Sequence, residues 1–142
     1  MQQTQGGHDV QKFGDLIKEI PFAMFTTVTP DGGLRSRPMV AAGNAYDGKL
    51  WFFTRTSSAV AVEIGGNPNV NVSYVSAPED RFVSVTGRAS VVRDIDRATK
   101  MWIPAYNQWF SGGASDPELS MIAIEVSRIE YWDRKAGRMQ QL

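Results

Sequence analysis

The chain is dominated by short runs in which apolar and polar residues alternate, separated by turn-forming residues. Such alternation is typical of strands that bury one face and expose the other. Val70, Val72 and Tyr74, for example, fall on one face of an extended segment. The pattern predicts six strands, over residues 22–29, 33–41, 49–54, 69–76, 81–93 and 121–132.

Turn signals at short spacing connect these predicted strands. Pro, Gly, Asn and Asp gather at residues 30–33, 44–48 and 77–80, and Gly87 is a candidate β-bulge inside a long strand. Many short strands with few helices favour an antiparallel barrel or sandwich over an α/β fold. We therefore expect a mainly β fold with peripheral helices, in a single domain over residues 1–142.

Helical spacing of apolar residues marks three further segments. In the second, Ser57 or Ser58 is suited to cap the helix N-terminus. The third contains Pro104, which should kink the helix or shift its boundary because proline has no N–H to donate. Trp102 and Trp109 would share one face of it, as core or interface residues. The predicted helices span residues 8–20, 57–65 and 94–110.

Composition excludes several classes of function. The chain of 142 residues has 15 basic and 15 acidic residues, so no global field attracts nucleic acid or an anionic membrane. It contains no Cys and one His, and that residue, His8, falls in a lead over residues 1–8 that we predict to be disordered. A thiolate nucleophile, a His-based triad and a Cys or His metal site are therefore disfavoured. No segment approaches the roughly 20 apolar residues that span a bilayer, and we expect a cytoplasmic protein.

Two candidate anion-binding features remain. Arg35 and Arg37 lie on a predicted strand whose hairpin partner ends at Thr54, and arginine binds phosphate oxygens bidentately. Ser57 and Ser58 precede a helix, whose N-terminal N–H groups and dipole favour a phosphate. The alternatives are an ordinary hairpin with solvated arginines and a serine that only caps its helix.

The order of several short motifs resembles a known family. Each motif is weak alone, but their order and spacing from residue 13 to residue 132 are similar to the general stress protein branch of the pyridoxamine-phosphate-oxidase-like family, the FMN-binding split barrels. The motifs are Arg37-Pro38-Met39, Phe52-Phe53-Thr54, Asn67-Pro68-Asn69-Val70, Trp109-Phe110, Asp116-Pro117-Glu118-Leu119 and Tyr131-Trp132-Asp133.

The resemblance implies an FMN-binding split β-barrel of about six antiparallel strands, active as a homodimer. It implies that Arg37 reaches the cofactor phosphate, and that an aromatic residue of the second subunit, here Trp132, covers the flavin. No catalytic residue and no metal ligand is assigned. The implied cofactor-binding residues are Arg37, Pro38, Met39, Phe53, Thr54, Ser57, Ser58 and Trp132.

The chain departs from the family pattern just after the serines. Family members usually carry one or two basic residues there to reach the phosphate, whereas this chain has Ala59 and Val60. Arg55 or Arg35 could compensate. Two functions stay open: an FMN-dependent oxidoreductase acting on an unidentified small molecule, and a non-catalytic dimer that binds or senses a flavin or another ligand.

Overall fold

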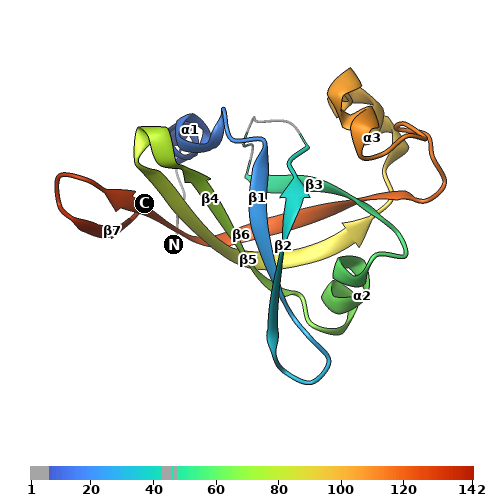
Figure 1. The fold of residues 1–142 in the computed structure, drawn as a ribbon, viewed down its shortest axis with the longest axis horizontal. Helices are drawn as coiled ribbons and strands as arrows, with labels where there is room; N and C mark the ends of the chain where they lie inside the picture. Colours follow the sequence, from blue (N-terminus) through green and yellow to red (C-terminus); the bar gives the residue numbers. More distant parts are fainter. Residues whose placement is uncertain (1–6, 43–45, 47) are drawn as a thin grey trace.

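The fold is a strongly curved antiparallel sheet of seven strands (Figure 1). The computed structural model describes residues 7–42, 46 and 48–142. Neighbouring strands follow the order β2-β1-β4-β5-β6-β3, and β7 pairs with β6 outside this path. The strands are β1 (Phe22–Val28), β2 (Leu34–Val40), β3 (Lys49–Arg55), β4 (Asn69–Ser76), β5 (Arg81–Val92), β6 (Leu119–Asp133) and β7 (Arg138–Gln141).

The sheet closes into a barrel at one end only. Beyond β2, Ala41 forms an isolated bridge with Phe52 of β3, and the Ala42 N–H donates to the Trp51 carbonyl at 2.8 Å. Elsewhere in the described part of the chain, the two edge strands do not pair. Helix α2 (Ala59–Gly66) lies where the β1–β2 hairpin and the end of β3 diverge (Figure 1) and contacts β1, β3 and β5. This is a split barrel, mainly β with peripheral helices, as the sequence predicts.

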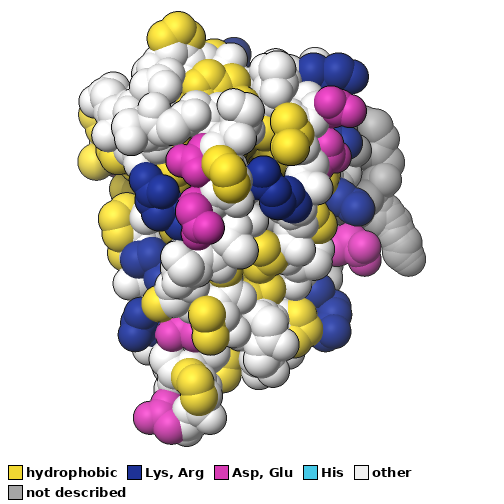
Figure 2. Space-filling model, turned by 90° about the vertical axis from the view of Figure 1, so that its right-hand side faces the viewer, with side chains coloured by type: hydrophobic (Ala, Val, Ile, Leu, Met, Phe, Trp, Pro, Cys, Tyr) yellow, Lys and Arg dark blue, Asp and Glu magenta, His cyan; other side chains and the backbone are white. Residues whose placement is uncertain are grey.

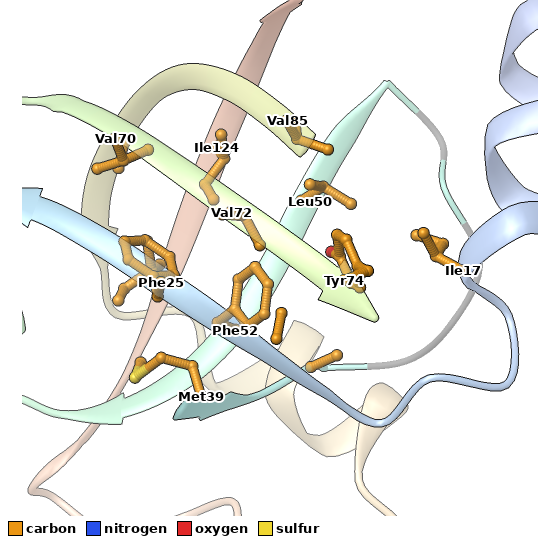
Figure 3. Close-up of a cluster of buried hydrophobic side chains, with 14 of the residues drawn as sticks. Ile17, Phe25, Met39, Leu50, Phe52, Val70, Val72, Tyr74, Val85 and Ile124 are labelled. Carbon is orange, nitrogen blue, oxygen red and sulfur yellow. The ribbon is translucent and has the colours of Figure 1, made fainter. Parts of the chain in front are cut away.

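The main core fills the inside of the barrel. Phe25 and Phe52 meet edge to face with ring centroids 5.3 Å apart, and Tyr74 is almost fully buried beside them. Helix α1 (Gly7–Ile17) covers one end with Phe13 and Ile17. Figure 3 shows side chains from α1 and from β1 to β6 converging, among them Ile17, Phe25, Met39, Leu50, Phe52, Val70, Val72, Tyr74, Val85 and Ile124.

A second, smaller cluster lies on the outer side of β3. Phe53 points into it and meets the rings of Trp102, Tyr106 and Phe110, with centroids 5.1, 5.2 and 6.1 Å away. Edge-to-face aromatic pairs of this kind stabilise a cluster by roughly 0.5–1.5 kcal/mol beyond area burial. The cluster fixes the segment after β5 against the sheet.

The predicted helix over residues 94–110 begins as expected after Asp94, but its extent to residue 110 is wrong and its boundary is shifted ahead of Pro104. Asp94 caps α3 (Ile95–Met101), but the chain then becomes extended at Trp102 and Ile103 before the 3₁₀ helix η3 (Pro104–Gln108). The cause is steric, because a residue before proline is pushed away from helical geometry. The shared face of Trp102 and Trp109 therefore does not exist: Trp109 is exposed and packs against Phe22.

The other predicted elements are present, with small shifts at their ends. Helix α1 ends at Ile17 rather than at residue 20, β4 matches its predicted range, and Ser58 rather than Ser57 caps α2. Strand β7 was not predicted. The lead over residues 1–8 and the turn over residues 44–48 fall largely on residues 1–6, 43–45 and 47, which lie outside the described residues, while Gly7 and His8 belong to α1.

Gly87 forms the bulge that the sequence indicated. The register between β5 and β6 shifts between Thr86 and Gly87, and a Cβ at Gly87 would lie 2.7 Å from Cγ2 of Ile124 and closer still to the Glu125 carbonyl oxygen. We expect Gly87→Ala to lower the free energy of unfolding by about 1–3 kcal/mol through overpacking, measured by urea denaturation. Gly14→Ala is the control, since nothing lies within 4 Å of an added Cβ there. Equal effects of both substitutions would contradict the close approach.

Candidate functional site

Hydroxyl groups tie the end of β3 to the start of α2. The Ser58 side chain accepts a hydrogen bond from the Ala61 N–H at 3.2 Å and so caps the helix. Its Oγ also lies 2.8 Å from Oγ1 of Thr54, which is buried at the end of β3. Helix geometry leaves the other N–H groups of the first turn without intrahelical acceptors. Ser57 and Ala59 are exposed beside them, so this helix start can offer donors to an anion or a polyol.

Arg37 lies in a hydrogen-bonded network between β2, β1 and α2. Its Nη2 donates to Oε1 of Glu63 at 2.7 Å, and its Nη1 donates to Oγ1 of Thr27 at 2.7 Å. Thr27 in turn donates to the same Glu63 oxygen at 2.6 Å. Nη1 also reaches the Phe25 and Arg35 carbonyl oxygens at 3.3 Å. The three side chains therefore form a closed triangle, which we call the Arg37–Glu63–Thr27 network.

The charges of this network are largely enclosed. The Glu63 side chain is 6% exposed and that of Arg37 is 18% exposed, whereas Arg35 is half exposed and lies 3.7 Å from the second Glu63 oxygen. The hydrogen bond from Thr27 holds the pKa of Glu63 below its ordinary value; burial opposes this, and Arg37 and Arg35 lower the pKa further. Glu63 is therefore a carboxylate at neutral pH.

The structure gives Arg37 a partner that the sequence analysis missed. Arg37 is neither a solvated strand arginine nor an uncommitted one, because Glu63 neutralises it. The two residues are separated by 26 positions in the sequence, so no local motif links them. A single acidic residue in an otherwise apolar helix, residues 59–66, was the available signal. The predicted contact of Arg37 with a phosphate stays a prediction.

The remaining predicted residues occupy distinct places. Met39 is buried in the main core, and Pro38 is exposed on β2 opposite Met24. Phe53 is buried in the second cluster, so core packing accounts for its side chain. Thr54 and Ser58 are in contact, and Ser57 is exposed next to them.

Trp132 lies far from this group within one chain. Ser120, which pairs with Thr54, and Trp132 are both on β6, 132 − 120 = 12 residues apart. A strand rises about 3.3 Å per residue, so these residues are near opposite ends of a long strand. Figure 1 shows the β6–β7 hairpin on the side of the molecule away from α2. Only a second copy of the chain could bring a Trp132 to the start of α2.

The described surface offers few other chemical groups. Across the residues that the structure describes, no three His, Cys, Asp or Glu side chains are grouped to hold a metal ion. The helices found there are all too short or too polar to cross a membrane. Figure 2 shows basic and acidic side chains interspersed on the face that carries α2 and α3, which does not resemble a nucleic-acid footprint.

Ionisation of Glu63 should make the stability of the folded protein depend on pH. Because its pKa in the folded protein is lowered from the ordinary 4.5, its contribution to stability is complete above that value and is lost as the pH falls through the lowered pKa. We expect Glu63→Gln to lower the unfolding midpoint at pH 7, and the difference from wild type to shrink below about pH 4.5. Urea denaturation from pH 7 to pH 3 measures this.

Glu19→Gln provides the matched control for that experiment. Glu19 is exposed and forms no ion pair in the described structure, so the same change of charge should have little effect at any pH. A Glu63→Gln difference that stays constant from neutral to acidic pH would contradict a role for the ionised carboxylate.

Three comparisons relate this chain to known proteins. The family model described as "Pyridoxamine 5'-phosphate oxidase like" matches residues 8–142. Protein bli-3 of Neurospora crassa is 30% identical over 134 residues, which cover 85% of this chain and 64% of that protein. The match thus spans slightly less than two-thirds of the length of that relative.

Two solved structures share the fold. The general stress protein 26 of Bacillus anthracis superposes with a TM-score of 0.78 at 24% identity, covering 95% of this chain and 99% of the other. The general stress FMN/FAD binding protein of Xanthomonas citri has a TM-score of 0.72 at 27% identity, covering 87% of each chain. The family and branch expected from the order of the motifs are confirmed, and the chain belongs to the pyridoxamine 5'-phosphate oxidase-like family.

Proposed function

We propose that this chain binds a flavin at the start of α2, as a homodimer, and takes part in electron or hydride transfer with a small molecule. The observation that carries the proposal is the set of donors where the barrel is open: the Thr54–Ser58 hydroxyl pair and the N–H groups of the first helical turn. Family membership and the flavin-binding name of the Xanthomonas relative support it.

The residues at the start of α2 fit the ribityl chain of a flavin nucleotide better than its dianionic phosphate. Hydroxyls of Thr54, Ser57 and Ser58 and the helix N–H groups suit a ribityl chain or a phosphate oxygen. A dianionic phosphate would have few positive charges beside it, because Arg37 is paired with Glu63 and position 59 is an alanine. When bound, a flavin would supply the redox chemistry. The chain's own part would be to orient the ring, with the backbone groups of Pro38 and Met39 bordering it.

Exposed apolar side chains favour assembly of two copies. Phe22 and Met24 on β1 are 42% and 43% exposed, and Trp109 stacks edge to face on Phe22 with centroids 5.2 Å apart while remaining 41% exposed. Aromatic residues and Met are enriched in protein interfaces. A homodimer would cover this patch and would allow Trp132 of a second copy to approach the flavin.

A second candidate function is supported by the scarcity of catalytic groups. The described residues near the start of α2 provide no acid–base pair, and Glu63 is committed to Arg37 and Thr27. The chain would then be a non-catalytic dimer in the cytoplasm that stores or senses a flavin or a related ligand. Both functions require that a flavin-sized ligand binds.

The first experiment is therefore a flavin titration. We expect the purified chain to quench the fluorescence of added FMN and of riboflavin with saturation near one flavin per chain, because the helix start and the hydroxyls contact parts common to both. Absence of saturation with either ligand up to millimolar concentration would contradict the proposal. Heat-unfolded protein is the control for nonspecific quenching.

Position 59 tests where the phosphate would lie. Val60 is 4% exposed and packs in the main core, so a lysine there would bury its charge, whereas Ala59 is exposed at the first position of α2. We expect Ala59→Arg to tighten FMN binding by up to about fivefold, roughly 1 kcal/mol for a partly exposed pair. The gain should fall as salt rises, and riboflavin binding should not change.

The matched control for that change is on the same helix. Val62 is 65% exposed near the middle of α2, so Val62→Arg adds the same charge away from the helix start. An equal gain from Val62→Arg would show that net charge, rather than a phosphate at the N-terminus of α2, determines the affinity.

A further inference from the structure

We propose that Glu63 is a specificity-determining residue of this site: its carboxylate occupies Arg37 in place of a ligand phosphate, so that the chain binds riboflavin about as well as FMN. The inference rests on the proposed flavin site and concerns which part of the ligand the chain recognises. It follows because the site has few unpaired positive charges, whereas the phosphate of FMN carries two negative charges.

The contacts of Arg37 engage both of its terminal nitrogens and pair its charge with that of Glu63. One terminal nitrogen donates to Glu63, and the other is shared among the Thr27 hydroxyl and two backbone carbonyls. A guanidinium has five N–H donors, and these contacts engage both terminal nitrogens but not Nε. To bind a phosphate through both terminal nitrogens, Arg37 would have to leave Glu63, and a phosphate at any other edge of the guanidinium would meet a charge that Glu63 already neutralises.

Distance along α2 separates the two possible anions. Glu63 follows the cap residue Ser58 by 63 − 58 = 5 positions, which is about 7.5 Å along a helix axis. A phosphate at the helix start and the Glu63 carboxylate therefore lie on different turns. Arg37 carries one positive charge, and in the structure that charge is paired with Glu63.

Release of Arg37 from Glu63 is opposed by burial. Glu63 is held by Thr27 at 2.6 Å and is almost enclosed, so departure of the guanidinium would leave a carboxylate unpaired in a poorly solvated place. Removing one partner of such a pair is unfavourable. Arg35 lies 3.7 Å from Glu63 and is half exposed, so it replaces Arg37 only weakly.

Other cations near the helix start do not make up the deficit. Ala59 and Val60 stand at the first two positions of α2. Arg55 is exposed at the end of β3 and forms no ion pair among the described residues, but a solvated, flexible side chain contributes little. The neutral donors of Thr54, Ser57 and Ser58 remain, and they can bind a hydroxyl of the ribityl chain as well as a phosphate oxygen.

The test is the dissociation constant of riboflavin divided by that of FMN, measured by fluorescence titration for wild type and variants. A higher ratio means a stronger preference for FMN. We expect a ratio within about threefold of one for wild type, and a rise of about tenfold in Glu63→Gln, the equivalent of one hydrogen bond to a charged group. Glu63→Gln keeps the side-chain shape and frees the Arg37 charge. Glu19→Gln, which makes the same change in net charge at an exposed position, should leave the ratio unchanged.

A second variant keeps the inference testable if Glu63→Gln does not fold. Thr27→Val removes the hydroxyl that donates to Glu63 and accepts from Arg37, without a change in net charge. It should raise the ratio in the same direction but by less. Arg37→Ala in the Glu63→Gln background should return the ratio to the wild-type value, because the gain depends on the freed guanidinium.

The outcomes separate this inference from the proposed function. If wild type binds FMN more than about threefold tighter than riboflavin, or if flavins bind but the folded Glu63 and Thr27 variants leave the ratio unchanged, the inference is wrong and the flavin site stands. If neither flavin binds to wild type or to any variant, the proposed function fails and the inference fails with it.

Discussion

At the open side of the barrel, the position of α2 against the β1–β2 hairpin depends on the Arg37–Glu63–Thr27 network. The edge strands β2 and β3 meet through a bridge at only one end, so the sheet itself does not hold the other end together. Helix α2 bridges that gap with an apolar face, Val60 and Ile64, and with one carboxylate. The apolar contacts provide most of the adhesion, while the network fixes the angle and register of the helix, because a hydrogen-bonded triangle tolerates little displacement.

The strands were predictable because each buries one face, and burial of alternate side chains imposes a period of two on the sequence. The two failures have different causes. Residues 94–110 have helical spacing, yet Ile103 precedes a proline and the chain is extended there. Strand β7 is mostly polar, Arg138–Gln141, and pairs only with the end of β6. Without a buried face it leaves no periodic signal, and its pairing is visible only in three dimensions.

In the candidate site, too, some features could be predicted from the sequence and others could not. The cap at Ser58 could be predicted because capping is a local interaction between a side chain and the N–H groups of the next turn. The partner of Arg37 could not, because a tertiary contact over 26 positions has no local motif. Thr27 could not be identified from the sequence either, because threonine is common in strands for packing reasons. A family motif identifies which residues are present along the chain, but the charge available to a ligand is set by contacts that the motif does not contain.

This distinction matters for what the fold can recognise. A cation that faces a crevice and has no partner attracts any anion of suitable size, so the ligand's charge dominates selection. When the anion is an internal carboxylate, held by Thr27 at 2.6 Å, the ion pair has no net charge. Its electrostatic attraction for an anionic ligand is then largely lost. Selection then passes to hydroxyl and backbone donors and to apolar surfaces, which distinguish ligands by shape. Two chains of this family with the same fold and the same arginine can therefore prefer different ligands, according to whether a carboxylate on α2 reaches that arginine first.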